Sequence, residues 1–399
     1  MVVFWRVLLG IAAFGLVSSS VFLLLAIIAA IRFKFLSDKM RRATLNLSDE
    51  SLPPVTIFKP VHGMEERLEQ NLESFFRQDY PNYEVIIGAR ASNDPAILVA
   101  ERLRMRYPQV KSRILISGPP PWPNAKVFTL DKMIALSRND FFVISDSDVR
   151  VGQDFLRNVI PPLFDRKLGL VSCLYRGEPA NDFWSLLEAL GMSVEMPSGV
   201  VMADMLEGIR FALGPAVALR REALDAIGGI RTTADYYSDD YVLGNKIWAA
   251  GYKVIFSHYF IDHVLTPRPF IRTLGDQLRW MKSTRHSRPK GHIGTGLTFA
   301  MPFGLLGLLA AIALGEPLLG LLFFAAAYLN RVIQSMAVGW WLLRDRHALL
   351  LAWLYPLRDL QGFSVWLASF LSRDFFWRGE MYRFTGGGRI IPRDRDVAL

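Results

Sequence analysis

Cysteine is nearly absent from this chain of 399 residues, which contains only one. A single cysteine excludes an intrachain disulfide and any metal centre built from several thiolates. That residue, Cys173, stands in the apolar run 168–174 and is interpreted as a buried strand residue. The sequence also lacks internal repeats and low-complexity stretches. These absences exclude a disulfide framework, a cysteine metal cluster and a repeat architecture.

Acidic residues are in the minority, with 37 Asp and Glu against 46 Lys and Arg and a formal net charge of +9. The arginines gather beside apolar segments, where basic residues set topology and bind anionic headgroups. This pattern favours an anionic lipid bilayer over nucleic acid as the partner. Hydrophobic residues make up 51% of the chain and crowd its start and its last third. The distribution predicts a catalytic domain held at a membrane.

Residues 4–33 contain a long apolar run that only Arg6 and three serines interrupt before Arg32. The run is too long for the core of a signal peptide, and it exceeds the roughly 20 apolar residues that span a bilayer. Basic residues follow at once, which predicts a cytoplasmic location for the next segment. We therefore expect residues 1–50 to be a transmembrane signal anchor with a basic linker, in an integral protein of the inner (cytoplasmic) membrane.

Residues 51–292 alternate short apolar strands with amphipathic helices. This alternation predicts an α/β fold with a mostly parallel sheet covered on both faces. Ligands of such sheets bind beyond the carboxyl ends of the strands. This segment is expected to be the cytoplasmic catalytic domain, with strands at 55–58, 83–88, 113–116 and 141–145.

Residues 293–399 are apolar again and are expected to form a C-terminal membrane region. Two spans are predicted, at 297–314 and 318–343. Polar residues inside a span face protein or a ligand path. A contact with a lipid headgroup is therefore one interpretation of the three that share a face of the second span, Asn330, Arg331 and Gln334.

A weaker apolar stretch, 349–371, is interrupted by Pro356, Arg358 and Asp359. A full crossing there would put an arginine-rich tail outside, against the positive-inside tendency. We favour a re-entrant or interfacial hairpin, followed by a basic tail on the cytoplasmic side. The tail arginines are Arg373, Arg378, Arg383, Arg389, Arg393 and Arg395.

Two carboxylates end the apolar strand at 141–145, in Asp146-Ser-Asp148. In an extended segment residues i and i+2 share a face, so both could reach one ion. Mg²⁺ or Mn²⁺ prefers such oxygen ligands and keeps places for phosphate oxygens. His263 is a third candidate metal ligand, although a lone histidine is more often structural. A strand-end turn rich in Asp and Ser is the alternative for the motif.

Other strand ends carry candidates for binding a nucleotide or its phosphates. Asp94 could bind a base or ribose, or it could cap a helix that begins at Pro95. Both roles are compatible, because a strand-end cap sits at the ligand edge of the sheet. The remaining candidates are Lys59, Pro60 and His62 in one loop, and Lys126 in another.

Asp240, in Ser238-Asp-Asp-Tyr241, is a candidate general base for an acceptor hydroxyl. The alternative is that both acids stabilise a helix N-terminus. Arg279 and Trp280 lie in a basic amphipathic stretch. Arg279 could bind a departing diphosphate, and Trp280 could stack on a sugar or lie at the headgroup level. A plain interfacial helix is the competing interpretation.

The order of these motifs resembles that of the ceramide glucosyltransferase-like enzymes, which are glycosyltransferase family 21 with the family 2 type of fold. The likeness runs from about residue 54 to 388. It is carried by Phe58-Lys-Pro-Val-His-Gly, Asn71-Leu-Glu-Ser-Phe-Phe, Asp79-Tyr-Pro-Asn-Tyr-Glu-Val, Asn93-Asp-Pro-Ala-Ile, Asp146-Ser-Asp-Val-Arg, Ser238-Asp-Asp-Tyr, Leu278-Arg-Trp and Trp377-Arg-Gly.

The resemblance implies a nucleotide-sugar-binding, Rossmann-like domain of the glycosyltransferase A type. Asp94 would then contact the uridine, Asp146 and Asp148 the metal and diphosphate, and Asp240 would be the base. Arg279 and Trp280 would end a (Gln/Arg)-x-x-Arg-Trp motif, whose first position here is Asp276.

The acceptor-side segment 192–206 lacks a histidine that animal ceramide enzymes carry near this position. Among bacterial relatives the chain looks most like the hopanoid-biosynthesis-associated glycosyltransferases, which transfer N-acetylglucosamine. The implied function is inverting transfer of a hexose, glucose or N-acetylglucosamine, from a UDP-sugar donor to a membrane lipid acceptor of the hopanoid or ceramide type. A processive polysaccharide synthase and a non-catalytic membrane sensor of nucleotide-sugars are the alternatives.

Overall fold

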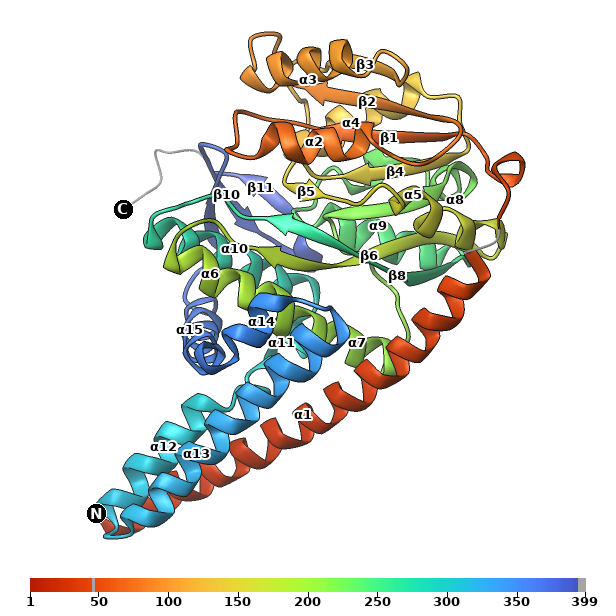
Figure 1. The fold of residues 1–399 in the computed structure, drawn as a ribbon. Coiled ribbons are helices and arrows are strands. Elements are labelled where there is room, and N and C mark those ends of the chain that lie inside the picture. Colours follow the sequence, from red (N-terminus) through yellow and green to blue (C-terminus); the bar gives the residue numbers. More distant parts are fainter. Residues whose placement is uncertain (45–46, 394–399) are drawn as a thin grey trace.

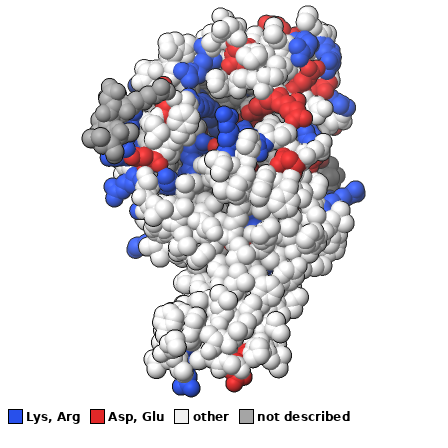
Figure 2. Space-filling view, turned by 90° about the vertical axis from the view of Figure 1, so that its left-hand side faces the viewer, with Lys and Arg blue, Asp and Glu red and all other residues white. Residues whose placement is uncertain are grey.

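The protein consists of a sheet-containing domain that stands on a helical stalk (Figure 1). The computed structural model describes residues 1–44 and 47–393, so the predicted tail residue Arg395 lies outside the described residues. The stalk is formed by α1 (Val2–Thr44), α12 (Met301–Ala313) and α13 (Pro317–Gln334), which pack against one another. Figure 2 shows charged side chains gathered on the domain and few on the stalk.

The domain is built on an eight-stranded mixed sheet, and the predicted α/β class is confirmed. Its strand order is β3-β2-β1-β4-β7-β6-β8-β5. The half made of β1 to β4 is parallel, as predicted, but β7 pairs antiparallel with both β4 and β6. The strands are β1 (Val55–Pro60), β2 (Tyr83–Ala89), β3 (Lys111–Ile116), β4 (Phe141–Ser145), β5 (Val149–Arg150), β6 (Leu168–Glu178), β7 (Ala216–Arg220) and β8 (Lys253–Val264).

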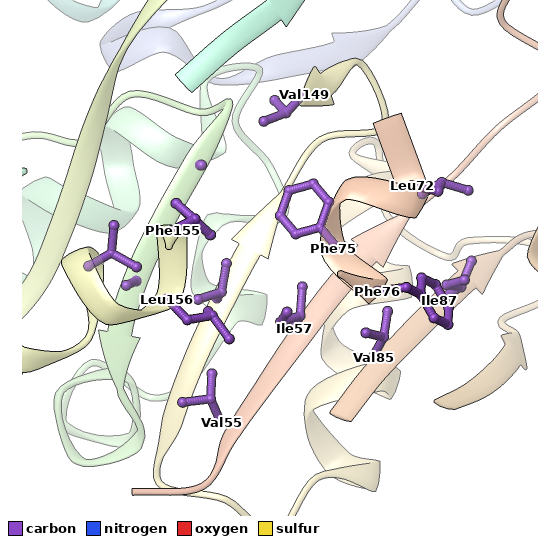
Figure 3. Close-up of a cluster of buried hydrophobic side chains, with 14 of the residues drawn as sticks. Val55, Ile57, Leu72, Phe75, Phe76, Val85, Ile87, Val149, Phe155 and Leu156 are labelled. Carbon is purple, nitrogen blue, oxygen red and sulfur yellow. The ribbon is translucent and has the colours of Figure 1, made fainter. Parts of the chain in front are cut away.

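Apolar runs explain why the central strands form. The side chains of β1 point alternately to the two faces, and both faces are buried, so a continuous apolar run satisfies it. On one face, Ile57 and Val85 meet Phe75 and Phe76 of α2 (Figure 3). Cys173 is 1% exposed within β6, which confirms its interpretation as a buried strand residue.

Helices cover both faces of the sheet and connect it to the stalk. The α-helices of the domain and its membrane side are α2 (Leu68–Phe76), α3 (Pro95–Arg106), α4 (Ala125–Leu136), α5 (Phe155–Val159), α6 (Phe183–Leu190), α7 (Met196–Glu207), α8 (Arg221–Ala226), α9 (Asp239–Ala249), α10 (Phe270–Ser287), α11 (Pro289–Thr295), α14 (Arg346–Leu350) and α15 (Tyr355–Ala368). Two π-helical segments, η3 (Gly191–Glu195) and η5 (Ser335–Leu342), continue α6 and α13. Short 3₁₀ turns are η1 (Asp49–Ser51), η2 (Pro161–Phe164), η4 (Ile230–Thr233), η6 (Ala352–Leu354) and η7 (Gly386–Gly388).

Within the described part of the chain, three helices are long and apolar enough to cross a membrane: Val2–Arg42, Phe183–Glu207 and Pro317–Leu342. The span expected at 297–314 is a helix of only 13 residues, α12. At 1.5 Å per residue it is about 20 Å long, shorter than a hydrocarbon core of about 30 Å. Conversely, the helix over Phe183–Glu207 was not expected as an apolar helix of this length.

The polar residues of α13 bind protein rather than a lipid headgroup. Arg331 is 2% exposed and donates to the Asp359 carboxylate of α15 over 3.0 Å. The other oxygen of Asp359 accepts the backbone N–H groups of Ala300 and Met301 at 3.0 and 2.8 Å. Asn330 contacts Ser20 and Gln334 contacts Ser198. The suggested headgroup contact is therefore wrong for these three residues, because their polar groups connect α1, α7, α12, α13 and α15.

The basic tail folds onto the catalytic domain as a second sheet. Its strands β9 (Asp374–Trp377), β10 (Glu380–Phe384) and β11 (Ile390–Pro392) are antiparallel. Lys282 of α10 donates to the Asp374 carbonyl over 2.7 Å, and the N–H of Ile390 donates to the Asp235 carbonyl over 2.8 Å. These bonds place the tail beside α10 and the loop before α9.

Candidate active site

The strand ends of the parallel half-sheet meet at one edge, as predicted, but Lys59 does not reach the surface there. It is 0% exposed, and its ammonium bonds to Ser145 Oγ and the Asp146 carbonyl and lies over the Phe75 ring. Burial lowers the pKa of Lys59 to about 7. Lys59 therefore fixes the end of β4 from within, while Pro60 continues β1 toward the loop that carries His62.

Asp94 is the N-cap of α3, with Pro95 at the first helical position as predicted. Its carboxylate accepts the N–H of Ala96 at 3.0 Å and that of Gly63 at 3.0 and 3.1 Å. His62 Nδ1 lies 3.2 Å from the same carboxylate. Asp94 therefore joins the loop after β1 to the start of α3. The imidazole of His62 remains more than half exposed at this edge.

Lys126 links the Asp146 motif to the two acids before α9. Its ammonium lies 2.6 Å from Asp146 Oδ1 and 3.8 Å from Asp239 Oδ2. Burial lowers the pKa of this ammonium, but the Asp146 and Asp239 carboxylates outweigh it, and the net shift is upward. Asn124, the N-cap of α4, also donates to Asp239 over 3.2 Å. A permanent cation is thus held beside the candidate diphosphate site.

Asp148 faces a different group of side chains from Asp146. The pairing of Val149 in β5 with His263 in β8 places Asp148 Oδ2 3.4 Å from His263 Nε2. Asp148 Oδ1 and His263 Nδ1 are buried and have no hydrogen-bond partner among the described residues. Within residues 1–44 and 47–393, no three His, Cys, Asp or Glu side chains converge as metal ligands. A cation such as Mg²⁺, which takes one or two carboxylates together with phosphate oxygens and water, still fits this donor set.

Asp240 lies in the first turn of α9 and lines a cavity of about 460 Å³. Burial and the neighbouring Asp239 raise its pKa to about 7. Gly214 leaves room for it, since a Cβ at that position would lie 2.9 Å from Asp240 Oδ2. A carboxyl group with this pKa can accept a proton near neutral pH.

Arg279 and Trp280 reach the same region from α10. Arg279 donates to Tyr237 Oη over 2.6 Å and pairs with Asp276 over 2.8 Å. Asp276, the unusual first position of the motif, therefore orients its arginine, while Gln277 turns toward Arg358. Trp280 lines the cavity and is 38% exposed.

Arg378 is a residue of this region that no functional assignment from the sequence included. It lies in the turn between β9 and β10 with φ of +51°, a left-handed conformation that costs energy for a residue with a side chain. The Tyr237 ring packs on Trp377 at 5.2 Å and holds this hairpin against the loop before Asp240. Burial lowers the pKa of the Arg378 guanidinium, and the charges of Asp146 and Asp239 act in the opposite direction. The only sign of Arg378 in the sequence was its place in the Trp377-Arg-Gly motif.

The cavity extends from this edge to the helical segments η3 and α15. One end is formed by Lys126, Asp146 and Asp240, and the other by Glu195, Arg358 and Val365 of η3 and α15. The cavity therefore connects the cluster of Lys126, Asp146 and Asp240, which is suited to binding phosphate, with a space beside η3 and α15.

Comparisons with known proteins find relatives over most of the chain. The chain is 25% identical over 356 residues to ceramide glucosyltransferase 3 of Caenorhabditis elegans, covering 86% of this chain and 75% of the relative. It is 24% identical over 359 residues to ceramide glucosyltransferase 1 of the same organism, covering 86% and 74%. A solved mannosyltransferase from Pyrobaculum calidifontis, in complex with GDP-Man and Mn²⁺, has 19% identity and a TM-score of 0.48, covering 89% of this chain and 99% of that one. The family model described as glycosyl transferase family 21 matches residues 21–390, and the chain belongs to this family.

Proposed function

We propose that the protein transfers glucose or N-acetylglucosamine from a UDP-sugar to a hydroxyl of a membrane lipid, with inversion at the anomeric carbon. The observation that carries the proposal is the single cavity that joins Lys126, Asp146 and Asp240 to the membrane-side helices. A soluble donor and a lipid acceptor can meet only in such a space. The relatives named ceramide glucosyltransferase support a lipid acceptor, and a hopanoid or ceramide type remains the proposal.

In this mechanism the donor occupies the sheet edge and the acceptor approaches from the membrane side. Asp240 takes the proton from the lipid hydroxyl as that oxygen attacks the anomeric carbon. Lys126, Arg279 and Arg378 stabilise the departing UDP, since cations bind the charge that develops on a diphosphate. We assign Asp94 and the His62 loop to the uridine side, and Trp280 to the sugar. Holding both substrates in one cavity supplies much of the rate enhancement.

We further propose that Mg²⁺ or Mn²⁺ binds at Asp148 and His263, beside Asp146. The unpartnered oxygen of Asp148 supports this site. When bound, the ion supplies positive charge for the diphosphate. For the orientation we propose that the catalytic domain faces the cytoplasm of the inner membrane, where basic residues after the α1 span would lie.

The function is tested by incubating membranes that contain the protein with UDP-glucose or UDP-N-acetylglucosamine and a lipid extract of the host. We expect UDP release and a lipid product heavier by one hexose or one N-acetylhexosamine, detected by mass spectrometry. EDTA should abolish transfer, and added Mg²⁺ or Mn²⁺ should restore it. A ladder of masses would instead identify a processive synthase, and UDP-sugar binding without UDP release would identify a sensor.

Replacing Arg378 with glycine should weaken UDP binding by roughly 10- to 100-fold, because a hydrogen bond to a charged group contributes about 1.5–3 kcal/mol. The Tm should not fall, since glycine adopts the positive φ without strain. Titration calorimetry with UDP measures the affinity. The matched control is Arg344→Gly, which removes the other non-glycine residue with positive φ, at +59° and outside the cavity. Equal UDP affinity in wild type and Arg378→Gly would contradict the assignment.

A further inference from the structure

The membrane-side end of the cavity has a polar wall that the donor does not use. Glu195 of η3 pairs with Arg358 of α15, Oε2 to Nη2, over 2.9 Å. The other terminal nitrogen of Arg358 donates to Gln277 Oε1 over 3.3 Å. Glu188 of α6 lies in the same wall. Four polar side chains from four helical segments therefore meet in this wall. Ionisable residues near membrane helices are costly to bury, so where they occur they are usually paired and mark a functional site.

Two donors in this wall lack partners. Arg358 and Gln277 are 8% and 5% exposed, and both line the cavity. Arg358 Nε and Gln277 Nε2 have no hydrogen-bond partner among the described residues. A buried donor left unsatisfied costs about 1–3 kcal/mol. Both atoms are enclosed by protein, so the wall is held in place without help from water.

Two glycines make room for the ion pair. A Cβ at Gly362 would lie 3.3 Å from Glu195 Oε2 and 3.5 Å from Arg358 Nη1. A Cβ at Gly191 would collide with the Arg358 guanidinium. The chain therefore accommodates Arg358 and Glu195 through two residues without side chains, as expected of a formed binding site.

The charges of the wall discriminate between headgroups. Glu188 and Glu195 supply two carboxylates, and the one cation among the four polar residues, Arg358, is already paired. A phosphate would meet these carboxylates and gain no free cation. A hydroxyl or amide group carries no charge and can donate its hydrogen to one of these carboxylates. Met192, Met196 and Val365 offer apolar contacts for the adjoining hydrocarbon.

We propose that this wall is the acceptor headgroup site, in which Glu188 and the Glu195–Arg358 pair admit an uncharged headgroup bearing hydroxyl or amide oxygens and reject a phosphate-bearing one. The inference rests on the proposed function, since it concerns the acceptor of that transfer. It assigns lipid selectivity to Glu188, Glu195 and Arg358, and donor binding to the opposite end of the cavity.

The test uses the full-length protein in phosphatidylcholine vesicles with UDP-sugar and, as competing acceptors, ceramide, diacylglycerol and phosphatidylglycerol. Mass spectrometry gives the ratio of kcat/KM values for the three lipids. Glu195→Gln leaves Arg358 without its carboxylate and should raise the ratio of phosphatidylglycerol to ceramide at least tenfold. Glu188→Gln should raise it in the same direction. The KM for the donor and the affinity for UDP should not change in either variant.

Glu207→Gln is the matched control, because Glu207 lies at the end of α7, 61% exposed, and pairs with Arg288 outside the cavity. Its acceptor ratio should equal that of wild type. The proposal is overturned if both cavity variants bind UDP normally and keep the wild-type ratio, or if they change the donor KM instead. A wild type that releases no UDP with any of the three lipids or with host lipids would refute the proposed function itself, which is a separate result.

Discussion

Asp240→Asn should lower sugar transfer by roughly 10²- to 10⁴-fold, the usual contribution of a positioned general base. The amide has the shape of the carboxylate but cannot take the proton of the acceptor hydroxyl. UDP affinity should remain that of wild type, because Lys126 and Asp146 are left in place. Rates of lipid-product formation, together with calorimetric titration of UDP, separate the two effects.

The pH profile of the wild type provides an independent check on the same residue. In the proposed mechanism Asp240 acts in its ionised form, and its pKa is raised to about 7 by burial and by Asp239. The proportion of active base therefore falls as pH drops through about 7, and kcat/KM should fall with it. An unperturbed aspartate would keep its activity to far lower pH, since its pKa is about 3.9.

Asp225→Asn is the control for Asp240→Asn, because Asp225 is an exposed acid at the end of α8. It should retain both transfer and the acidic limb of the profile. If Asp240→Asn transferred sugar at the wild-type rate with UDP binding intact, another group would have to be the base.

Arg331→Met should destabilise the stalk by about 3–5 kcal/mol, the cost of breaking a buried ion pair on one side. The substitution leaves the Asp359 carboxylate buried, 3% exposed, with only the two N–H groups at the start of α12 as partners. Since Arg331 also holds Asn330, the contact of α13 with α1 should loosen as well. Thermal unfolding in detergent measures the loss as a lower Tm.

The double variant Arg331→Met/Asp359→Asn distinguishes an ion-pair effect from simple packing loss. It removes both charges while keeping an oxygen that can accept from Ala300 and Met301. It should be less destabilised than Arg331→Met alone, because no unpaired charge stays buried. A double variant that is as unstable as the sum of its two single variants would indicate that the residues act independently.

The sequence predicted those parts of the fold that depend on local patterns. The four apolar runs became β1 to β4, and Asp94 with Pro95 began α3, since strand alternation and helix capping depend on neighbouring residues. The antiparallel β7 and the packing of the tail were not predictable in this way. They depend on pairing between residues far apart in the chain, such as Tyr236 with Arg389.

In the candidate site, too, local motifs were predictable from the sequence and tertiary contacts were not. Asp146, Asp240 and Arg279 were recognised from their motifs. In the structure Asp146 and Asp240 line the cavity with Lys126, and Arg279 bonds to Tyr237 of the same lining. Three other features depend on tertiary contacts and could not be predicted. They are the burial of Lys59, the position of Asp148 opposite His263, and the arrival of Arg378 from the tail. Glu195 stands among apolar residues in the sequence, and its ion-pair partner Arg358 comes from α15, far along the chain.

The length of α1 gives the membrane a mechanical connection to the cavity. The helix has 43 residues, about 65 Å at 1.5 Å per residue, so it extends well beyond a single bilayer crossing. Its inner half enters the core of the domain, where Ala29, Ala30 and Phe33 are at most 4% exposed. A helix anchored in this way moves together with the domain as one rigid body. Because helices tilt to match the thickness of the bilayer, the proposed function predicts that a thicker or thinner membrane rotates the domain and changes the height at which the acceptor lipid meets Asp240.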